Sequence, residues 1–260
     1  MIKVIKEDIL PSIKSWHLWS VLGWLELRQR YKRSSIGPFW ITISMGLLII
    51  ALGYIYGELF GVKLEEYLPL LAIGLVFWVF MNGVITEGCQ AFISSSPYIG
   101  QLPTNKFIFI MQTVWRNFVM LIHNFIIVIA VVIYYDTLTI SSIPIFLLGF
   151  IIVLLNLFWI CLLCAITSLR FRDFPQIVAS FMQIIFYITP ILFSGTMLSK
   201  YKLLLAFNPF AWFIDIIRSP LIGQKADLYS YYNALTLLVF GTIFTIYIYK
   251  ISYKKIAYWI

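Results

Sequence analysis

RQRYKRSSIGPFW, residues 28 to 40, joins a basic cluster directly to a long apolar run. Four cationic side chains occupy six positions, and Gly37-Pro38 follows almost at once. Proline is favoured in the first turn of a helix, so an apolar helix is expected to begin there. The uncharged residues 34–57 are long enough to cross a hydrocarbon layer about 30 Å thick. This stretch therefore predicts a membrane-spanning helix with cations anchored at one end.

The composition of the whole chain agrees with this interpretation. Of its 260 residues, 62% are hydrophobic and only 12% are charged, whereas a soluble domain carries roughly 25% charged residues. Too few polar residues remain to cover a water-facing surface of this size. In a soluble protein the net charge of +8 would suggest nucleic acid, but here it is expected to mark the ends of spans, and no nucleic-acid partner is predicted.

Stretches of about 20 residues without charge predict six transmembrane helices. The segment between the last two spans, about 203–223, is apolar but interrupted by Asn208-Pro209 and Ser219-Pro220, so re-entrant half-helices are expected there. Residues 13–33, rich in tryptophan, leucine and cations, predict an N-terminal interfacial helix. The fold class is thus an all-α polytopic membrane protein with a single domain, 1–260. The spans are predicted at about 38–57, 67–93, 107–135, 144–169, 174–198 (with a break at Thr189-Pro190) and 228–249.

The distribution of lysine and arginine predicts the orientation. In the six-span arrangement thirteen of the nineteen cations lie on the side that carries the termini, five lie on the opposite side, and Arg116 lies within a span. Cations concentrate on the cytoplasmic side of membrane proteins. Both termini are therefore expected in the cytoplasm.

Catalytic signatures are scarce in this sequence. It contains no phosphate-binding P-loop and none of the common hydrolase or metalloprotease motifs, so no catalytic residue or metal ligand is predicted. Cys161 and Cys164 form a CxxC pair without a second ligand pair, which indicates apolar packing. Of the charged groups inside spans, Arg116 is interpreted as a cation that snorkels toward the interface or pairs with a neighbour such as Glu87, or alternatively as one that meets an anionic substrate group.

Forty-seven aromatic residues are expected mostly to face lipid or the membrane interface. Aromatic rings also stack on sugars, so a pore for a glycan would use some of them. The candidates for such channel aromatics are Tyr54, Tyr56, Phe186, Tyr187 and Phe193. The inner loop Ser94 to Lys106 is either an idle connector or a short docking helix, because its prolines and glycine allow both.

Three motifs in order resemble those of type-2 ABC exporter permeases. RYKRSSIGPFW is similar to the start of their first span, LRFRDFPQI (169–177) to the turn between their fourth and fifth spans, and FNPFAWFIDIIR (207–218) to their Asn-Pro element. The resemblance covers almost the whole chain and favours the subgroup that exports polysaccharides. Pro38 departs from many relatives but is not expected to disturb the fold.

The resemblance implies a homodimer that pairs with two copies of a separate ATPase subunit. That subunit would hold ATP and magnesium, so no cofactor is expected in this chain, whose surroundings are the lipids of a bacterial inner membrane. The implied substrate is a glycan on an undecaprenyl pyrophosphate lipid. Its pyrophosphate would meet Arg28, Arg30, Tyr31, Lys32 and Arg33. ATPase coupling would fall to Ser96, Pro97, Tyr98, Gln101, Leu102 and Pro103, and the outer gate to Asn208, Pro209 and Phe210.

The function expected from the resemblance is the permease subunit of an ATP-driven exporter, with the O-antigen of lipopolysaccharide as cargo. A capsule or teichoic acid exporter and a drug-type exporter are alternatives of the same class. A membrane-embedded glycan-transferring enzyme is a different class, which would need a catalytic acid or histidine facing a large outer loop. A purely structural scaffold would not need the broken helices at 203–223.

Overall fold

The computed structural model describes residues 2–32, 37, 39–101, 104–193 and 205–259. Every regular element in these ranges is a helix, and no strand occurs among them. The predicted all-α, polytopic membrane class is therefore confirmed. Within the same ranges five helices are long and apolar enough to cross a membrane. They are α4 (Phe39–Phe60), α5 (Leu64–Gly88), α8 (Phe107–Tyr134), α9 (Ile143–Arg170) and α13 (Leu228–Ser252).

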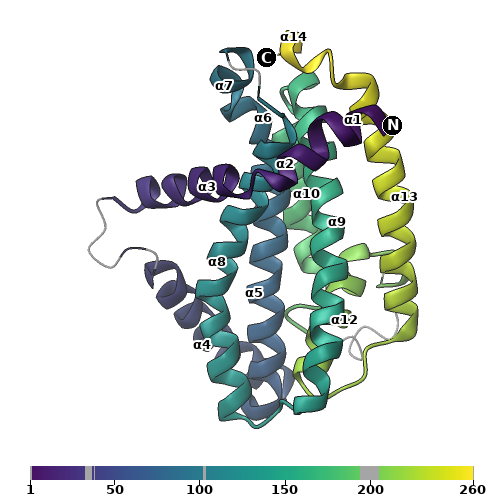
Figure 1. The fold of residues 1–260 in the computed structure, drawn as a ribbon. Helices are drawn as coiled ribbons and strands as arrows, with labels where there is room; N and C mark the ends of the chain where they lie inside the picture. Colours follow the sequence, from purple (N-terminus) through teal and green to yellow (C-terminus); the bar gives the residue numbers. More distant parts are fainter. Residues whose placement is uncertain (1, 33–36, 38, 102–103, 194–204, 260) are drawn as a thin grey trace.

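Helix α5 forms the centre of the bundle. Of its most apolar stretch 78% is buried, against 17% for the corresponding stretches of α4 and α13. It packs against α8, α4 and α9, and α13 packs on the far side of α9 (Figure 1). Helix α5 is apolar on all sides, as a fully enclosed helix must be, whereas α4 and α13 present wide apolar faces outward.

Helix α3 (Trp16–Arg30) lies across the bundle rather than along it (Figure 1). It packs on α8, and Gly23 marks the crossing: a Cβ added there would lie 3.0 Å from Trp115 Cδ1 and 3.3 Å from the Gln112 carbonyl oxygen. The absence of a side chain at Gly23 lets the two backbones approach. Trp16, Leu18 and Trp24 stay exposed on α3, which suits a helix in a membrane interface.

A short N-terminal segment precedes α3 and packs at the same end of the bundle as the C-terminus (Figure 1). It consists of α1 (Ile2–Val4), the π-helical turn η1 (Ile5–Ile9) and α2 (Leu10–Lys14). Four other short elements complete the fold. Helices α6 (Ala91–Ser94), α7 (Ser96–Gln101) and α14 (Ile256–Trp259) lie at the end with the termini, and the 3-10 turn η2 (Ile140–Ser142) precedes α9.

Helix α10 (Phe174–Ile188) is shorter than the five long helices. It ends where the sequence predicted a break: Thr189 is the first residue in extended conformation, and Pro190 follows. Residues 194–198 of the predicted fifth span lie outside the described residues, so the six-span count stays a prediction. Both termini lie at the same end of the bundle (Figure 1), an arrangement that an even number of crossings produces.

Helix α12 (Pro209–Leu221) occupies the apolar segment that precedes the last span. Asn208 caps it, because its Oδ1 accepts a hydrogen bond of 3.0 Å from the Phe210 amide. The Asn208 amide group also donates to Thr189 Oγ1 at 3.0 Å. Deeper along the helix, the buried Arg218 guanidinium donates to the Pro190 carbonyl at 2.6 Å. The Asn-Pro element and the Thr-Pro break are thus joined, and α12 packs back onto α9, α13 and α5.

Candidate functional site at the end that carries the termini

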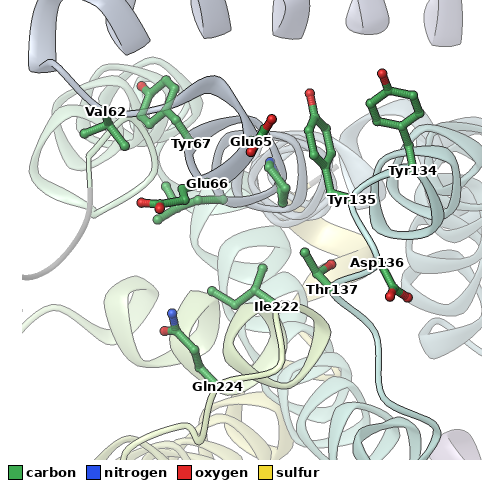
Figure 2. Close-up of a pocket in the computed structure, with 12 residues that line it drawn as sticks. Val62, Glu65, Glu66, Tyr67, Tyr134, Tyr135, Asp136, Thr137, Ile222 and Gln224 are labelled. Atoms are coloured by element: carbon green, nitrogen blue, oxygen red, sulfur yellow. The ribbon is translucent and has the colours of Figure 1, made fainter.

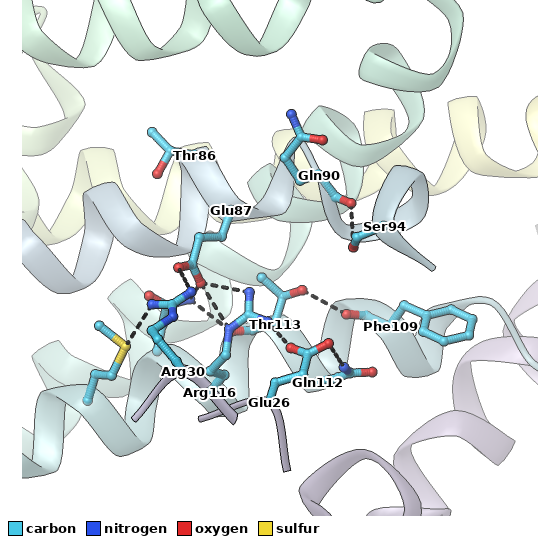
Figure 3. Close-up of polar contacts among 12 residues, drawn as sticks. Glu26, Arg30, Thr86, Glu87, Gln90, Ser94, Phe109, Gln112, Thr113 and Arg116 are labelled. Carbon is cyan, nitrogen blue, oxygen red and sulfur yellow. Dashed lines mark hydrogen bonds and ion pairs between the residues drawn. The ribbon is translucent and has the colours of Figure 1, made fainter. Parts of the chain in front are cut away.

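A network of two carboxylates and two guanidinium groups joins α3 to the central helices (Figure 3). Glu87, near the end of α5, accepts hydrogen bonds from three residues: Arg116 at 2.8 and 3.1 Å, Asn117 at 2.7 Å and Arg30 at 3.0 Å. Arg116 also pairs with Glu26 of α3, whose second oxygen accepts from Gln112 at 2.7 Å. The two negative and two positive charges balance inside the network.

The half of the network on α5 and α8 is largely removed from water, whereas Arg30 and Glu26 of α3 remain 45% and 40% exposed. The Arg116 side chain is 14% exposed and that of Glu87 is 24% exposed. Charges in such surroundings interact strongly but must be paired. At the interfacial helix, burial acts to lower the pKa of Arg30, yet the hydrogen bond to Glu87 and its charge leave that pKa raised. The predicted pairing of Arg116 with Glu87 is confirmed, and Glu26 and Arg30 extend it to α3.

The basic cluster of the opening sequence divides into two groups. Arg30 points into the network, whereas Arg28, Tyr31 and Lys32 line a cavity of about 400 Å³ between α3, α4 and α8. Arg33 lies outside the described residues. The floor of the cavity is apolar, and Arg28 and Lys32 are exposed at its edge. Its other lining residues are Trp24, Leu27, Gly37, Ile41, Val119, Met120 and His123.

The predicted docking loop contains the short helix α7. Ile99 packs inward and is 8% exposed, while Pro97, Tyr98 and Gln101 face outward and Ser96 is half-buried. Tyr98 stacks on Phe109 of α8, with ring centroids 6.5 Å apart. Leu102 and Pro103 lie outside the described residues. The predicted docking helix is therefore present as a helix, although its role stays a prediction.

A cavity of about 460 Å³ separates α7 from α3. On one side it is lined by Leu18, Leu22 and Leu25 of α3, and on the other by Ser95 and Tyr98. Glu26 and Gln112, both members of the polar network, form part of its wall. A groove with an apolar side and a polar floor lies next to the network.

The predicted channel aromatics do not form one cluster. Tyr54 is 63% exposed and Tyr56 packs on Phe60, both on α4. Phe186 and Tyr187 lie on α10, where Phe186 packs on Trp78 of α5. Phe193 is half-buried just beyond α10. Their assignment to a channel stays a prediction. The predicted gate residues Asn208, Pro209 and Phe210 lie together at the start of α12, where Phe210 contacts Trp78.

Sequence reasoning missed Asp8, which is fully buried. Its carboxylate accepts from the backbone amides of Lys106 (2.7 Å) and Phe107 (3.1 Å) and from the hydroxyl of Tyr249 (2.6 Å). It thereby caps α8 and joins the N-terminal segment to the end of α13. A single acid in a polar N-terminal stretch carries no local sign of such a role.

No family model matches the chain. Two curated relatives do, both named O-antigen export system permease protein RfbA and both from Klebsiella pneumoniae. One is 23% identical over 225 residues, which cover 83% of this chain and 86% of the relative. The other is 25% identical over 191 residues, 72% and 73% of the two chains. This chain is similar to O-antigen export permeases. The resemblance to type-2 ABC exporter permeases that the sequence motifs indicated is thereby confirmed.

Proposed function

We propose that this chain is the transmembrane permease subunit of an ATP-driven exporter that moves a lipid-linked polysaccharide, the O-antigen of lipopolysaccharide, out of the cytoplasm. The observation that carries the proposal is the match to two O-antigen export permeases over most of their length. The transmembrane helices and the interfacial helix α3 suit that role. In this proposal the chain is a transport subunit and not an enzyme, and the end with the termini faces the cytoplasm of a bacterial inner membrane.

The groove between α3 and α7 is the proposed contact for the ATPase subunit. Its leucines offer an apolar surface, and exposed residues of α7 border it. Movement of α3 would reach the core directly, because Glu26 and Arg30 both lie on α3 and pair with groups on α8 and α5. The polar network therefore supplies a physical connection between the ATPase contact and the transmembrane helices. In the complex we expect two permease chains and two ATPase chains.

The cavity beside Arg28 and Lys32 is the proposed capture site for the lipid carrier. A pyrophosphate requires cations, and a polyprenyl chain requires an apolar surface. Both are found together here, since the floor of the cavity includes Leu27, Ile41 and Val119 while the two cations lie at its edge. Arg30, although predicted to bind the pyrophosphate, is not included in this site, because its guanidinium group forms an ion pair with Glu87.

We expect that Lys32→Glu lowers export about tenfold or more, since one charge-assisted contact to a phosphate contributes about 1.5–3 kcal/mol. Export is measured as polysaccharide at the cell surface. Lys254→Glu is the matched control, an exposed lysine near the same end of the bundle but outside this cavity. Both variants should insert normally, as judged by the amount of chain in the membrane. Equal export by the two variants would show that Lys32 acts only through its general charge.

The function itself is tested in cells that lack their O-antigen exporter but still synthesise the lipid-linked glycan. Expression of this chain with its ATPase subunit is expected to restore surface O-antigen and to remove the glycan that accumulates inside. Purified chain alone is expected to hydrolyse no ATP. If both subunits are present in the membrane and ATP is hydrolysed, yet no polysaccharide reaches the surface, the proposal is wrong.

Capsule and teichoic acid exporters would share this architecture, and the names of the relatives favour O-antigen over them. Nothing comparable favours a glycan-transferring enzyme. The half-buried His123 contacts the Val119 carbonyl of its own helix at 2.8 Å and lines the cavity beside Arg28 and Lys32.

A further inference from the structure

The end of the bundle opposite the termini holds a cavity of about 960 Å³ (Figure 2). Three elements form it: the first turns of α5, the end of α8 with the loop that follows, and the segment after α12. Its volume lies in the upper part of the range that small-molecule sites occupy. The lining residues are Val62, Glu65, Glu66, Tyr67, Pro69, Leu70, Tyr134, Tyr135, Asp136, Thr137, Ile222 and Gln224.

Contacts to backbone carbonyl groups join the elements that surround this cavity. Thr137 Oγ1 donates to the Leu221 carbonyl at 3.2 Å, which joins the loop after α8 to the end of α12. Gly223 has φ of +70°, and a Cβ there would lie 3.1 Å from the Thr137 carbonyl oxygen, so only glycine permits this approach. Tyr67 donates to the Leu192 carbonyl at 2.5 Å on the other side. These contacts hold together the elements that line the cavity.

The rim, in contrast, keeps its polar groups free. Four polar side chains of the rim make no hydrogen bond or ion pair with any other described residue. They are the carboxylates of Glu65, Glu66 and Asp136 and the side-chain amide of Gln224, and all four are exposed. Asp136 has φ of +50°, a conformation that costs energy for a residue other than glycine. Asp136 therefore lies in a tight turn after α8, where it is one of the residues that line the cavity.

Two tyrosine rings complete the rim. Tyr134 is 81% exposed, and its ring centroid lies 4.9 Å from that of Tyr135 in an edge-to-face arrangement. Tyrosine combines an apolar ring with a hydroxyl group. The rings in Figure 2 stand at the edge of the cavity beside the carboxylate of Glu65.

This combination of groups selects one class of ligand. Carboxylates accept hydrogen bonds from hydroxyl groups, and an amide both donates and accepts. Aromatic faces pack on the C–H surfaces of a sugar ring. Three unpaired carboxylates repel phosphate and uronic acids. We infer that this cavity binds neutral, hydroxyl-rich sugar units, as an exit site for the polysaccharide. The inference rests on the proposed function and on its orientation, which places this end outside the cytoplasm.

The test is calorimetric titration of the full chain in lipid nanodiscs with two probes, a neutral glucan hexasaccharide and a uronic-acid hexasaccharide of equal length. The neutral probe is expected to bind saturably, and Tyr134→Ala is expected to weaken it about tenfold. Tyr232→Ala is the matched control, an exposed tyrosine (69%) that does not line the cavity, and it should bind as the wild type does. Absence of saturable binding, or equal binding by Tyr134→Ala, overturns the inference.

A second variant tests the charge selection. The wild type is expected to bind the uronic-acid probe at least about tenfold more weakly than the neutral probe. Neutralising the rim with Glu65→Gln, Glu66→Gln and Asp136→Asn should remove this difference. Asparagine tolerates positive φ at least as well as aspartate, so the turn is preserved. If the wild type binds both probes equally, the carboxylates do not select the ligand.

Surface export by the wild type separates this inference from the proposed function. If the chain supports export but does not bind the neutral probe saturably, the inferred exit site is wrong and the proposed function stands. Binding in a chain that supports no export, although its ATPase subunit is active, removes the function and leaves a sugar-binding cavity.

Discussion

Glu87→Gln is expected to lower the free energy of unfolding by about 2–3 kcal/mol and to release α3 from the bundle. The carboxylate of Glu87 serves Arg30, Arg116 and Asn117 at once. Without its charge, Glu26 alone remains to balance two guanidinium groups, one of them in a side chain only 14% exposed. Removing one member of a buried ionic group costs far more than removing an exposed one, because a desolvated charge is left unpaired.

Two measurements check this prediction. Thermal unfolding in detergent reports stability, and spin labels on α3 and α8 report whether α3 still lies across the bundle. The control is Lys3→Ala, which breaks the Lys3–Glu7 pair, whose side chains are 82% and 61% exposed. That change should cost no more than about 0.5 kcal/mol. If Glu87→Gln unfolds like the control and the spin-label distances do not broaden, the network does not hold α3.

The same variant is informative about coupling. In the proposed complex with the ATPase subunit, a released α3 would transmit less movement to α5 and α8. ATP hydrolysis by the complex should therefore persist while export falls. A parallel loss of both activities would instead indicate that the ATPase subunit fails to bind.

Composition and charge placement predicted the helical class because they depend on local properties. An uncharged run such as 34–57 must be helical if it lies in lipid, since no water is available to its backbone groups. The Thr189-Pro190 break was also predicted, because proline lacks an amide hydrogen and disfavours helical conformation in the residue before it. The end of α10 at Ile188 follows from these covalent properties.

Contacts between segments far apart in the sequence were harder to predict. The pairing of Arg116 with Glu87 could be predicted, since both are charges in apolar surroundings and need partners. Glu26 gave no such signal, because it lies in an interfacial stretch rich in tryptophan, leucine and cations, where a solvated acid is unremarkable. Its role depends on Gly23, which brings α3 close enough to α8 for the carboxylate to meet Arg116.

The aromatic residues show the same limit. With 47 of them in the chain, identity alone could not separate rings that face lipid from rings that line a cavity. The candidates chosen from the sequence lie on α4, on α10 and just beyond it. Tyr134 and Tyr135 instead meet the first turn of α5 and the segment after α12. Their proximity to these groups is set by the packing of three elements far apart in the sequence.

Asp8→Ala is expected to be among the most destabilising single changes in the chain, at about 2–4 kcal/mol. Asp8 caps the amino end of α8 through two backbone amides, and loss of such a cap alone costs about 1 kcal/mol. The hydroxyl of Tyr249, fully buried, also loses its acceptor, and an unsatisfied buried donor costs a further 1–3 kcal/mol or so. The N-terminal segment would then detach from the end of α13.

The series Asp8→Asn, Asp8→Ala and Glu7→Ala distinguishes this cap from a general effect of charge. Asparagine keeps one acceptor oxygen, so Asp8→Asn should fall between the wild type and Asp8→Ala in thermal unfolding. Glu7 is the matched control, because it is the adjacent acid in the same π-helical turn but its side chain is 61% exposed. Its removal should change stability by no more than about 0.5 kcal/mol.

Limited proteolysis gives an independent readout, since release of the cap exposes the bonds of residues 2–14 to cleavage, whereas Glu7→Ala should leave them protected. Equal unfolding midpoints for Asp8→Ala and Glu7→Ala would mean that α8 begins at Phe107 without help from the N-terminal segment.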